Sequence, residues 1–473
     1  MLILADLIQA ITNERPAWAT QAIKGAVVDS RQSTPGTLFI ALPGEHVDGH
    51  DFVRDAFELG ANYALVQRDM QLDFPKLDLR KGLPSGDDFA HTTPLIILVD
   101  DSLAALQEVA RFWRRKLDLR VIGITGSVGK STTKEVVASV LNQKYATLKN
   151  VGNLNNEIGL PLTILHLNEK HQCAVLEMGL YVPGEIAFLS EIAQPHVGVI
   201  TNVGVVHAER AGSQEEIAGG KAELVQALPA SPEGVAILNY DDPWVLAMAE
   251  KTKARVFFYG LSEKADLWAD NVEGLGLEGI RLCLHYGKEK LFLKVPLIGR
   301  HSVHTVLRAV AVGLVENLTW QEIINGLRAG NMQLRLVAVR SKSGALLLDD
   351  TYNASPQSMM AALNLLDEMS GRKVAVLGDM LELGQYEQAG HQKIGLRVAE
   401  VADLLVTVGE LGKIIAHAAR SADLPEEQII ILENSDQAIA YLENRLHEDD
   451  IALIKGSRGM RMDRIVTSLE AQR

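Results

Sequence analysis

The sequence predicts an α/β protein made of three domains. Its 473 residues correspond to about three domains of ordinary size. Short apolar runs typical of buried parallel strands alternate with segments of helical periodicity, which favours doubly wound sheets. Hydrophobic residues make up 47% of the chain and charged residues 22%, as in ordinary globular proteins. We expect an N-terminal α/β domain at 1–100, a central P-loop-type doubly wound domain at 101–330 and a Rossmann-like C-terminal domain at 331–473.

Composition narrows the class of protein. The net charge of −14 argues against sequence-independent nucleic-acid binding, which needs a basic surface. Cys173 and Cys283 are isolated thiols without disulfide spacing, which suits a reducing compartment and a non-catalytic role. The N-terminus has no basic segment of a signal peptide, and no apolar run reaches the roughly 18–20 residues of a membrane span. We therefore expect a cytoplasmic protein without membrane insertion.

The elements of the first domain are short. The pattern predicts two strands within 26–42 around a Pro35-Gly36 turn, a helix at 52–59, strands at 63–66 and 94–99, and a surface loop at 72–93.

A phosphate-binding loop opens the central domain. After a helix predicted at 102–116, Val121 to Ile124 reads as a buried strand, Gly126 to Gly129 as a loop, and Lys130 as the start of a helix. This order wraps backbone N–H groups around phosphates, with Lys130 reaching the β/γ-phosphates and the Ser131 hydroxyl holding Mg²⁺. Two residues separate the glycines where the general P-loop has four, and a turn that binds nothing is the alternative. The flanking strand and helix favour ATP binding.

Two further strands are predicted to end beside this loop. The strand at 173–176 leads into Glu177, and the strand at 197–202 leads towards His207. Ligands of doubly wound sheets bind at the carboxyl ends of the strands, so both side chains are candidate Mg²⁺ ligands, direct or through water. The alternatives are a surface or helix-capping carboxylate and a satisfied loop histidine. Their shared position favours a functional role.

Asn153, Asn155 and Asn156 form an amide cluster after a strand predicted at 145–148. Amides in such a loop can bind substrate carbonyls or form Asx-turns.

The remaining elements complete the α/β pattern. A hairpin around Gly287 and two helices, at 304–316 and 320–328, close the central domain. In the third domain, Ser355-Pro356 is a helix N-cap with proline at the first helical position. Strands of the third domain are predicted at 346–350, 374–377, 404–408, 429–432 and 451–454.

Several motifs resemble those of one family. Gly123–Ser131 resembles the nucleotide loop of the Mur ligases, which has the same short glycine spacing. Asp29-Ser30-Arg31, with the segments 39–44 and 48–50, is similar to the family's N-terminal UDP-binding domain. Segments that resemble the members adding D-alanyl-D-alanine to UDP-N-acetylmuramoyl-tripeptide lie at 349–356, 377–384 and 455–458. The resemblance spans all three domains.

The resemblance implies an ATP-dependent peptide ligase of cytoplasmic peptidoglycan precursor synthesis, acting as a monomer. ATP would phosphorylate the terminal carboxylate of the UDP-linked tripeptide, and the amine of D-alanyl-D-alanine would attack the resulting acyl phosphate. The third residue of the tripeptide, diaminopimelate or lysine, is left open.

The resemblance also implies roles for individual residues. Lys130, Lys221 and His207 would be catalytic, with Lys221 carbamylated so that it becomes a carboxylate-like metal ligand. Mg²⁺ would be held by Ser131, Glu177, His207 and Lys221. The nucleotide would contact Gly126, Ser127, Gly129, Lys130, Ser131, Thr132, His301, Arg335 and Asp350. The two peptide substrates would contact Asp29, Ser30, Arg31, Asn153, Asn155, Asn156, Tyr352, Asn353 and Ser355.

One motif departs from the family. The pattern Gly-x-His-Asn-x-x-Asn appears here with Ser302 in place of the first asparagine and Thr305 in place of the second, which is associated with adenine contact. A hydroxyl donates and accepts from one atom and cannot offer the separated donor and acceptor of an amide. The contact with adenine is therefore where we expect this chain to differ.

Two alternatives are weighed against this hypothesis. A folate polyglutamate-type ligase shares the phosphate loop but lacks the N-terminal UDP-binding domain, so residues 1–100 argue against it. A nucleotide-binding regulator without catalysis would not need the catalytic residues kept here, which are Lys130, Glu177, His207, Lys221 and Arg335.

Overall fold

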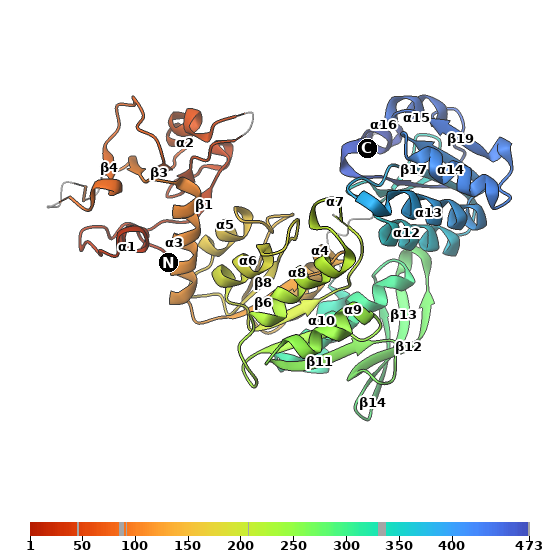
Figure 1. Ribbon diagram of the computed structural model, residues 1–473, viewed down its shortest axis with the longest axis horizontal. Helices are drawn as coiled ribbons and strands as arrows, with labels where there is room; N and C mark the ends of the chain where they lie inside the picture. Colours follow the sequence, from red (N-terminus) through yellow and green to blue (C-terminus); the bar gives the residue numbers. More distant parts are fainter. Residues whose placement is uncertain (45–46, 85–88, 91, 207, 330–336, 472–473) are drawn as a thin grey trace.

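Three β-sheets, each covered by helices, follow one another along the chain (Figure 1). The computed structural model describes residues 1–44, 47–84, 89–90, 92–206, 208–329 and 337–471. The prediction of three α/β domains is confirmed. Their limits near residues 100 and 330 stay predictions. Among the described residues, no helix combines the length and the apolar character needed to cross a membrane.

The N-terminal sheet is parallel and has the strand order β1-β2-β3-β5-β4. Its elements are α1 (Leu4–Thr12), β1 (Ala26–Val27), β2 (Leu38–Ile40), α2 (Val53–Glu58), β3 (Tyr63–Val66), β4 (Lys76–Asp78) and β5 (Leu95–Leu98). The expectation of a loop throughout 72–93 is wrong, because β4 pairs with β5 at the sheet edge. Only Leu77 of its three residues is apolar and buried, too little for a period of two to stand out.

The central sheet has nine strands in the order β14-β13-β12-β11-β10-β9-β6-β8-β7. The strands are β6 (Arg120–Thr125), β7 (Thr147–Lys149), β8 (Cys173–Glu177), β9 (Val197–Ile200), β10 (Val235–Asn239), β11 (Arg255–Gly260), β12 (Leu267–Gly274), β13 (Ile280–Tyr286) and β14 (Glu289–Val295). The run from β7 to β12 is parallel, and β13 and β14 form the predicted antiparallel hairpin.

Helices cover both faces of the central sheet. Alternation along β6 directs Val121 to one hydrophobic cluster and Ile122 and Ile124 to another, with α4 and α10 on the second side. The helices are α3 (Ser102–Lys116), α4 (Lys130–Leu141), α5 (Gly159–Leu165), α6 (Glu185–Ala193), α7 (Ala208–Ala211), α8 (Gln214–Gln226), α9 (Pro243–Leu246), α10 (Val303–Val315) and α11 (Trp320–Arg328). This layering leaves the carboxyl ends of β8, β6 and β9 side by side.

The C-terminal sheet has the order β15-β16-β20-β17-β18-β19, with only β15 antiparallel. Its strands are β15 (Val337–Arg340), β16 (Leu346–Asp350), β17 (Arg372–Gly378), β18 (Leu404–Val408), β19 (Ile429–Leu432) and β20 (Asp450–Lys455). Its helices are α12 (Pro356–Glu368), α13 (Glu387–Val401), α14 (Gly412–Ser421), α15 (Ser435–Leu442) and α16 (Asp463–Leu469). As predicted, Ser355 caps α12, with its hydroxyl accepting from the N–H of Ser358.

Candidate functional site

The phosphate loop between β6 and α4 depends on two glycines. Gly126 has φ +144°, and a Cβ there would lie 1.8 Å from Oγ1 of Thr201. Gly129 precedes α4 with φ +86°, a left-handed conformation that side chains disfavour. The backbone of this loop therefore favours glycine at both positions.

The end of β9 holds the loop in place. The N–H of Ser127 donates to the Asn202 carbonyl (2.9 Å), and the N–H of Val128 donates to Oδ1 of Asn202 (3.0 Å). The Thr201 hydroxyl donates to the Val128 carbonyl (2.7 Å). Nζ of Lys130 lies over the loop and donates to the carbonyls of Gly126 (2.8 Å) and Ser127 (3.2 Å).

A cavity of about 520 Å³ lies between this loop and the C-terminal domain. It joins residues predicted from two domains: Ser127, Gly129, Ser131, Thr132, His301, Asp350, Asn353 and Ser355. The N-terminus of α4 opens into it, and a helix N-terminus favours anions. The cavity thus has the form of a phosphate-binding cleft closed by two domains.

Glu177 ends β8 directly beside Ile124 of β6. Its side chain is 1% exposed, so it is not a surface carboxylate. Oε1 accepts a hydrogen bond from Nδ2 of Asn155 (2.9 Å), whereas the buried Oε2 has no hydrogen-bond partner among the described residues. A buried carboxylate oxygen without a donor suits a cation ligand.

Sequence reasoning missed Lys134, which lies beside Glu177. Its Nζ is 4.0 Å from Oε2 of Glu177 and 3.5 Å from Oε1 of Glu135, and it donates to the Gly152 carbonyl (3.0 Å). Burial lowers the pKa of this amine, and the charge of Glu177 opposes that effect. The signal in the sequence was a lysine one helical turn after Lys130.

Lys221 is buried in α8, which begins with a capping box at Ser213 and Glu216. No described residue forms a hydrogen bond or ion pair with its amine. Burial, and next the charge of Lys130, lower the pKa of the Lys221 amine well below its usual range. A neutral amine is the form that reacts with an electrophile such as CO₂.

The three asparagines of the amide loop have different surroundings. Asn155 reaches Glu177, as described above. Oδ1 of Asn156 accepts from the N–H of Gly159 (2.9 Å) at the start of α5, which is the Asx-turn alternative. Asn153 is exposed.

The predicted residues of the N-terminal domain lie outside the cavity. Asp29 caps a short 3₁₀ turn and holds Arg31 through two contacts, Nε–Oδ1 (2.9 Å) and Nη2–Oδ2 (2.7 Å). Hydrogen bonding with Arg31 lowers the pKa of Asp29. Ser30 is buried between them, and the domain extends away from the phosphate loop (Figure 1).

Residues of the C-terminal domain form the opposite wall. Asp350 pairs with the buried Lys455 (Oδ2–Nζ, 2.7 Å), whose Nζ also donates to the Asn353 carbonyl (2.8 Å). Tyr352 is 40% exposed beside them. Two predicted residues, His207 and Arg335, lie outside the described residues.

Arg308 is a second residue that sequence reasoning missed. It lines the cavity, is 3% exposed and donates to the hydroxyls of Thr133 (Nε, 2.9 Å), Thr305 (Nη2, 2.9 Å) and Tyr259 (Nη1, 3.3 Å). No carboxylate among the described residues pairs with it. As the only formally charged residue of the apolar helix α10, it stood out in the sequence.

Fold and cavity together define a phosphate-loop α/β protein with a nucleotide-type cleft between two domains. Family models match along most of the chain: the Mur ligase family catalytic domain at residues 22–114, the Mur ligase middle domain at 124–313 and the Mur ligase glutamate ligase domain at 334–458. The chain belongs to the Mur ligase family, as its motifs indicated.

Individual relatives agree with the family models. UDP-N-acetylmuramoyl-tripeptide–D-alanyl-D-alanine ligase of Bacillus subtilis is 36% identical over 98% of this chain and 97% of its own. The crystal structure of MurF from Acinetobacter baumannii has a TM-score of 0.82 and 31% identity, covering 98% of both chains. MurF ligase from Thermotoga maritima, in complex with ADP, has a TM-score of 0.76 and 28% identity over 94% of this chain and 97% of its own.

Burial of the Lys221 amine should lower the free energy of unfolding. Its pKa is lowered in the folded state, so between that pKa and 10.5, the value for an unperturbed lysine, the unfolded chain binds the extra proton and stability rises with pH. We expect Lys221→Met to raise the melting temperature at pH 7, with the difference from wild type shrinking as the pH approaches 10.5. Thermal unfolding at several pH values measures this, with Lys393→Met, an exposed lysine of α13, as the control. An unchanged or lower melting temperature for Lys221→Met would contradict the prediction.

Proposed function

We propose that this protein is an ATP-dependent peptide ligase that adds D-alanyl-D-alanine to UDP-N-acetylmuramoyl-tripeptide in peptidoglycan precursor synthesis. The observation that carries the proposal is the near full-length similarity to a ligase of that name, at 36% identity. The phosphate-loop cavity, shared by two domains, supports ATP as the nucleotide, as does the ADP complex of the Thermotoga maritima relative.

The reaction that we propose has two steps. A carboxylate oxygen of the tripeptide attacks the γ-phosphorus of ATP, giving an acyl phosphate and ADP. The amine of D-alanyl-D-alanine then attacks the acyl carbon, and the tetrahedral intermediate collapses to an amide as the phosphate leaves. The first step brings an anion towards a polyanion, so cationic groups must neutralise the developing charge.

Cationic side chains at the phosphate loop support this role. Lys130 lies over the phosphate loop, and Arg308 lies next to Gly129, where a Cβ would be 3.3 Å from Nη2. Both would face phosphates placed at the N-terminus of α4. On this proposal Gly126, Ser127 and Thr132 contact the phosphates, and Asp350 and His301 contact the rest of the nucleotide.

The residues present fit Mg²⁺. Oε2 of Glu177 and the hydroxyl of Ser131 are oxygen ligands of the kind that Mg²⁺ prefers, and Oε2 has no hydrogen-bond partner among the described residues, although the Lys134 amine lies 4.0 Å away. Lys221 would add a third oxygen ligand if it were carbamylated. The lowered pKa of its buried amine favours the neutral form, which is the form that reacts with CO₂. Bound Mg²⁺ would screen the phosphate charge. We assign His207 to the same site and Arg335 to the γ-phosphate from the family resemblance alone.

Substrate contacts are proposed at two further places. Asn155 links its loop to Glu177, so a UDP-peptide bound by Asn153, Asn155 and Asn156 would lie beside the metal. Tyr352, Asn353 and Ser355 would receive D-alanyl-D-alanine, and Asp29, Ser30 and Arg31 the uridine diphosphate end. The monomeric state and the cytoplasmic location stay predictions.

The first test is release of phosphate from ATP. We expect it to require both UDP-N-acetylmuramoyl-tripeptide and D-alanyl-D-alanine, with alanine alone unable to replace the dipeptide. Lys130→Ala should lower the rate by about a hundredfold or more, because a charge aimed at the transferred phosphoryl group is lost. Turnover independent of the dipeptide would refute the proposed acceptor, and turnover with folate and glutamate would favour the polyglutamate ligase.

Arg308 predicts a second result. Arg308→Met should weaken ADP binding by roughly ten- to a hundredfold, because a buried hydrogen bond to a charged group contributes about 1.5–3 kcal/mol. Isothermal titration calorimetry measures it, with thermal unfolding to verify the fold. The matched control is Arg328→Met, an exposed arginine of α11. Equal ADP affinity in a folded Arg308→Met protein would place the guanidinium outside the nucleotide site.

A further inference from the structure

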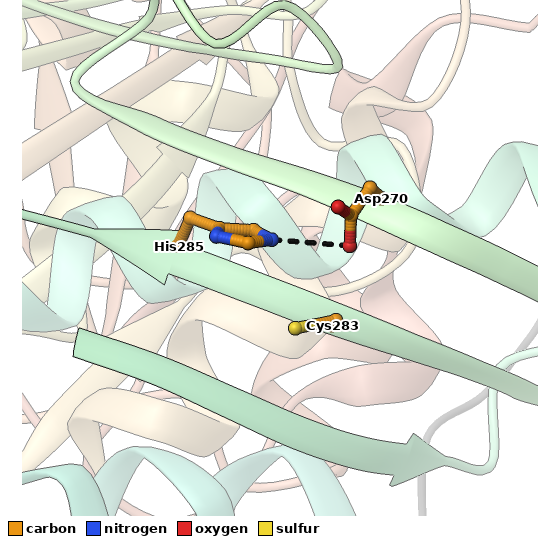
Figure 2. A group of neighbouring side chains, drawn as sticks. All are labelled: Asp270, Cys283 and His285. Atoms are coloured by element: carbon orange, nitrogen blue, oxygen red, sulfur yellow. Dashed lines mark ion pairs between the residues drawn. The ribbon is translucent and has the colours of Figure 1, made fainter. Parts of the chain in front are cut away.

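Three metal-binding side chains meet on one face of the antiparallel part of the central sheet. Asp270 of β12 lies opposite Cys283 of β13 in the strand register, and His285 follows Cys283 by two residues. Residues two apart on a strand point to the same side. Figure 2 shows the imidazole and the carboxylate approaching each other, with the thiol below them.

The distances suit a shared ligand. One ligand atom from each residue lies within 4.8 Å of the other two, and Nε2 of His285 is 3.0 Å from Oδ1 of Asp270. A tetrahedral Zn²⁺ with bonds of about 2.0–2.3 Å separates its ligand atoms by roughly 3.3–3.8 Å. Small side-chain rotations therefore close the set around one ion.

The ring of His285 is fixed in orientation, but its buried Nε2 lacks a hydrogen bond. Its ring stacks on Trp268, with centroids 3.7 Å apart and planes within 4°. Nε2 is buried, and although Asp270 is at ion-pair distance, the contact lacks hydrogen-bond geometry, and no other described residue supplies a partner. A buried, oriented ring nitrogen without a hydrogen bond costs free energy unless a further group binds it.

The backbone next to Asp270 is irregular. The strand register shifts between Asp270 and Glu273, and Asn271 has φ +48°. Such bulges re-aim the neighbouring side chain. The Asp270 side chain is 43% exposed, whereas that of His285 is 8% exposed and Cys283 is buried. The carboxylate therefore lies on the side of the cluster that is open to solvent.

Asp270 is the neighbour that the other two members share: it lies at ion-pair distance from His285 and opposite Cys283 in the strand register. Cys283 Sγ has a long contact to the Leu284 carbonyl (4.0 Å) and a side-chain hydrogen-bond contact with Asp270. A cation binds cysteine as the thiolate, so an ion bound at Cys283 would displace the S–H proton.

We propose that Asp270, Cys283 and His285 bind Zn²⁺. A thiolate, an imidazole and a carboxylate are the ligands that Zn²⁺ takes, and the sulfur selects it over Mg²⁺. Binding exchanges the S–H proton for a sulfur–zinc bond and releases one proton to solvent. The site is separate from the nucleotide cavity and does not depend on the proposed ligase activity.

Zinc would tie β12 to β13 close to a contact between domains. At the end of β12, Gly274 packs against Glu368 of α12, where a Cβ would lie 1.8 Å from Oε2. Joining the two strands at Asp270 and Cys283 would therefore stiffen β12, which carries Gly274. We expect added Zn²⁺ to raise the melting temperature.

Cobalt titration of the EDTA-treated full chain tests the proposal. We expect one equivalent of Co²⁺ to give a thiolate-to-cobalt charge-transfer band, and Zn²⁺ to abolish it by displacement. Cys283→Ser should remove the band, and both Cys283→Ser and His285→Gln should weaken Zn²⁺ binding by at least about tenfold, since loss of a ligand costs no less than loss of an outer-shell partner. Asp270→Asn, at a partly exposed position, should weaken binding while leaving the fold intact.

Two controls separate this site from others. Cys173→Ser removes the other buried free thiol and should keep the band. Glu177→Gln alters the proposed Mg²⁺ site and should also keep it. Absence of the band in wild type, or a band that Cys173→Ser removes and Cys283→Ser keeps, would overturn the proposal.

Discussion

Basic side chains buried without a carboxylate beside the phosphate loop are the constraint on which the site depends. Lys221 and Arg308 are both buried, and no carboxylate among the described residues pairs with either. An unpaired buried charge is expensive, and the N-terminus of α4 adds further positive potential. The fold meets this cost with hydroxyl partners around Arg308 and with a lowered pKa at Lys221. A polyanion in the cavity would supply the counter-charge that Arg308 lacks.

The strand order turns this local chemistry into a site. β6 lies between β8 and β9, so the phosphate loop has Glu177 on one side and Asn202 on the other. Alternation along β6 buries both faces under helices, and the rim of the sheet is left for polar groups. The C-terminal domain then closes the cavity with Asp350 and Lys455, which are held as an ion pair.

Elements with strong local signals were predictable from the sequence. Examples are the phosphate loop, the hairpin around Gly287 and the cap at Ser355. Turns and caps need particular residues at particular positions, so the sequence indicates them directly. Strand β4 could not be predicted, because a single buried leucine among three residues does not show the alternation typical of a strand. Lys134 and Arg308 were missed for another reason. Their importance comes from partners far along the chain, such as Glu177 and Tyr259, and only the fold brings these together.

The contact with Arg308 gives Thr305, which stands where the family has asparagine, a role of its own. A hydroxyl cannot replace the separated donor and acceptor of an amide, but here it accepts from Nη2 of Arg308. The guanidinium keeps its charge towards the cavity, so a neutral, directional contact is exchanged for a charged one. A guanidinium presents a planar fork of donors that matches the oxygens of a phosphate. The cavity wall formed by Thr305 and Arg308 would therefore favour a contact with phosphate over the contact with adenine that the family's asparagine is associated with.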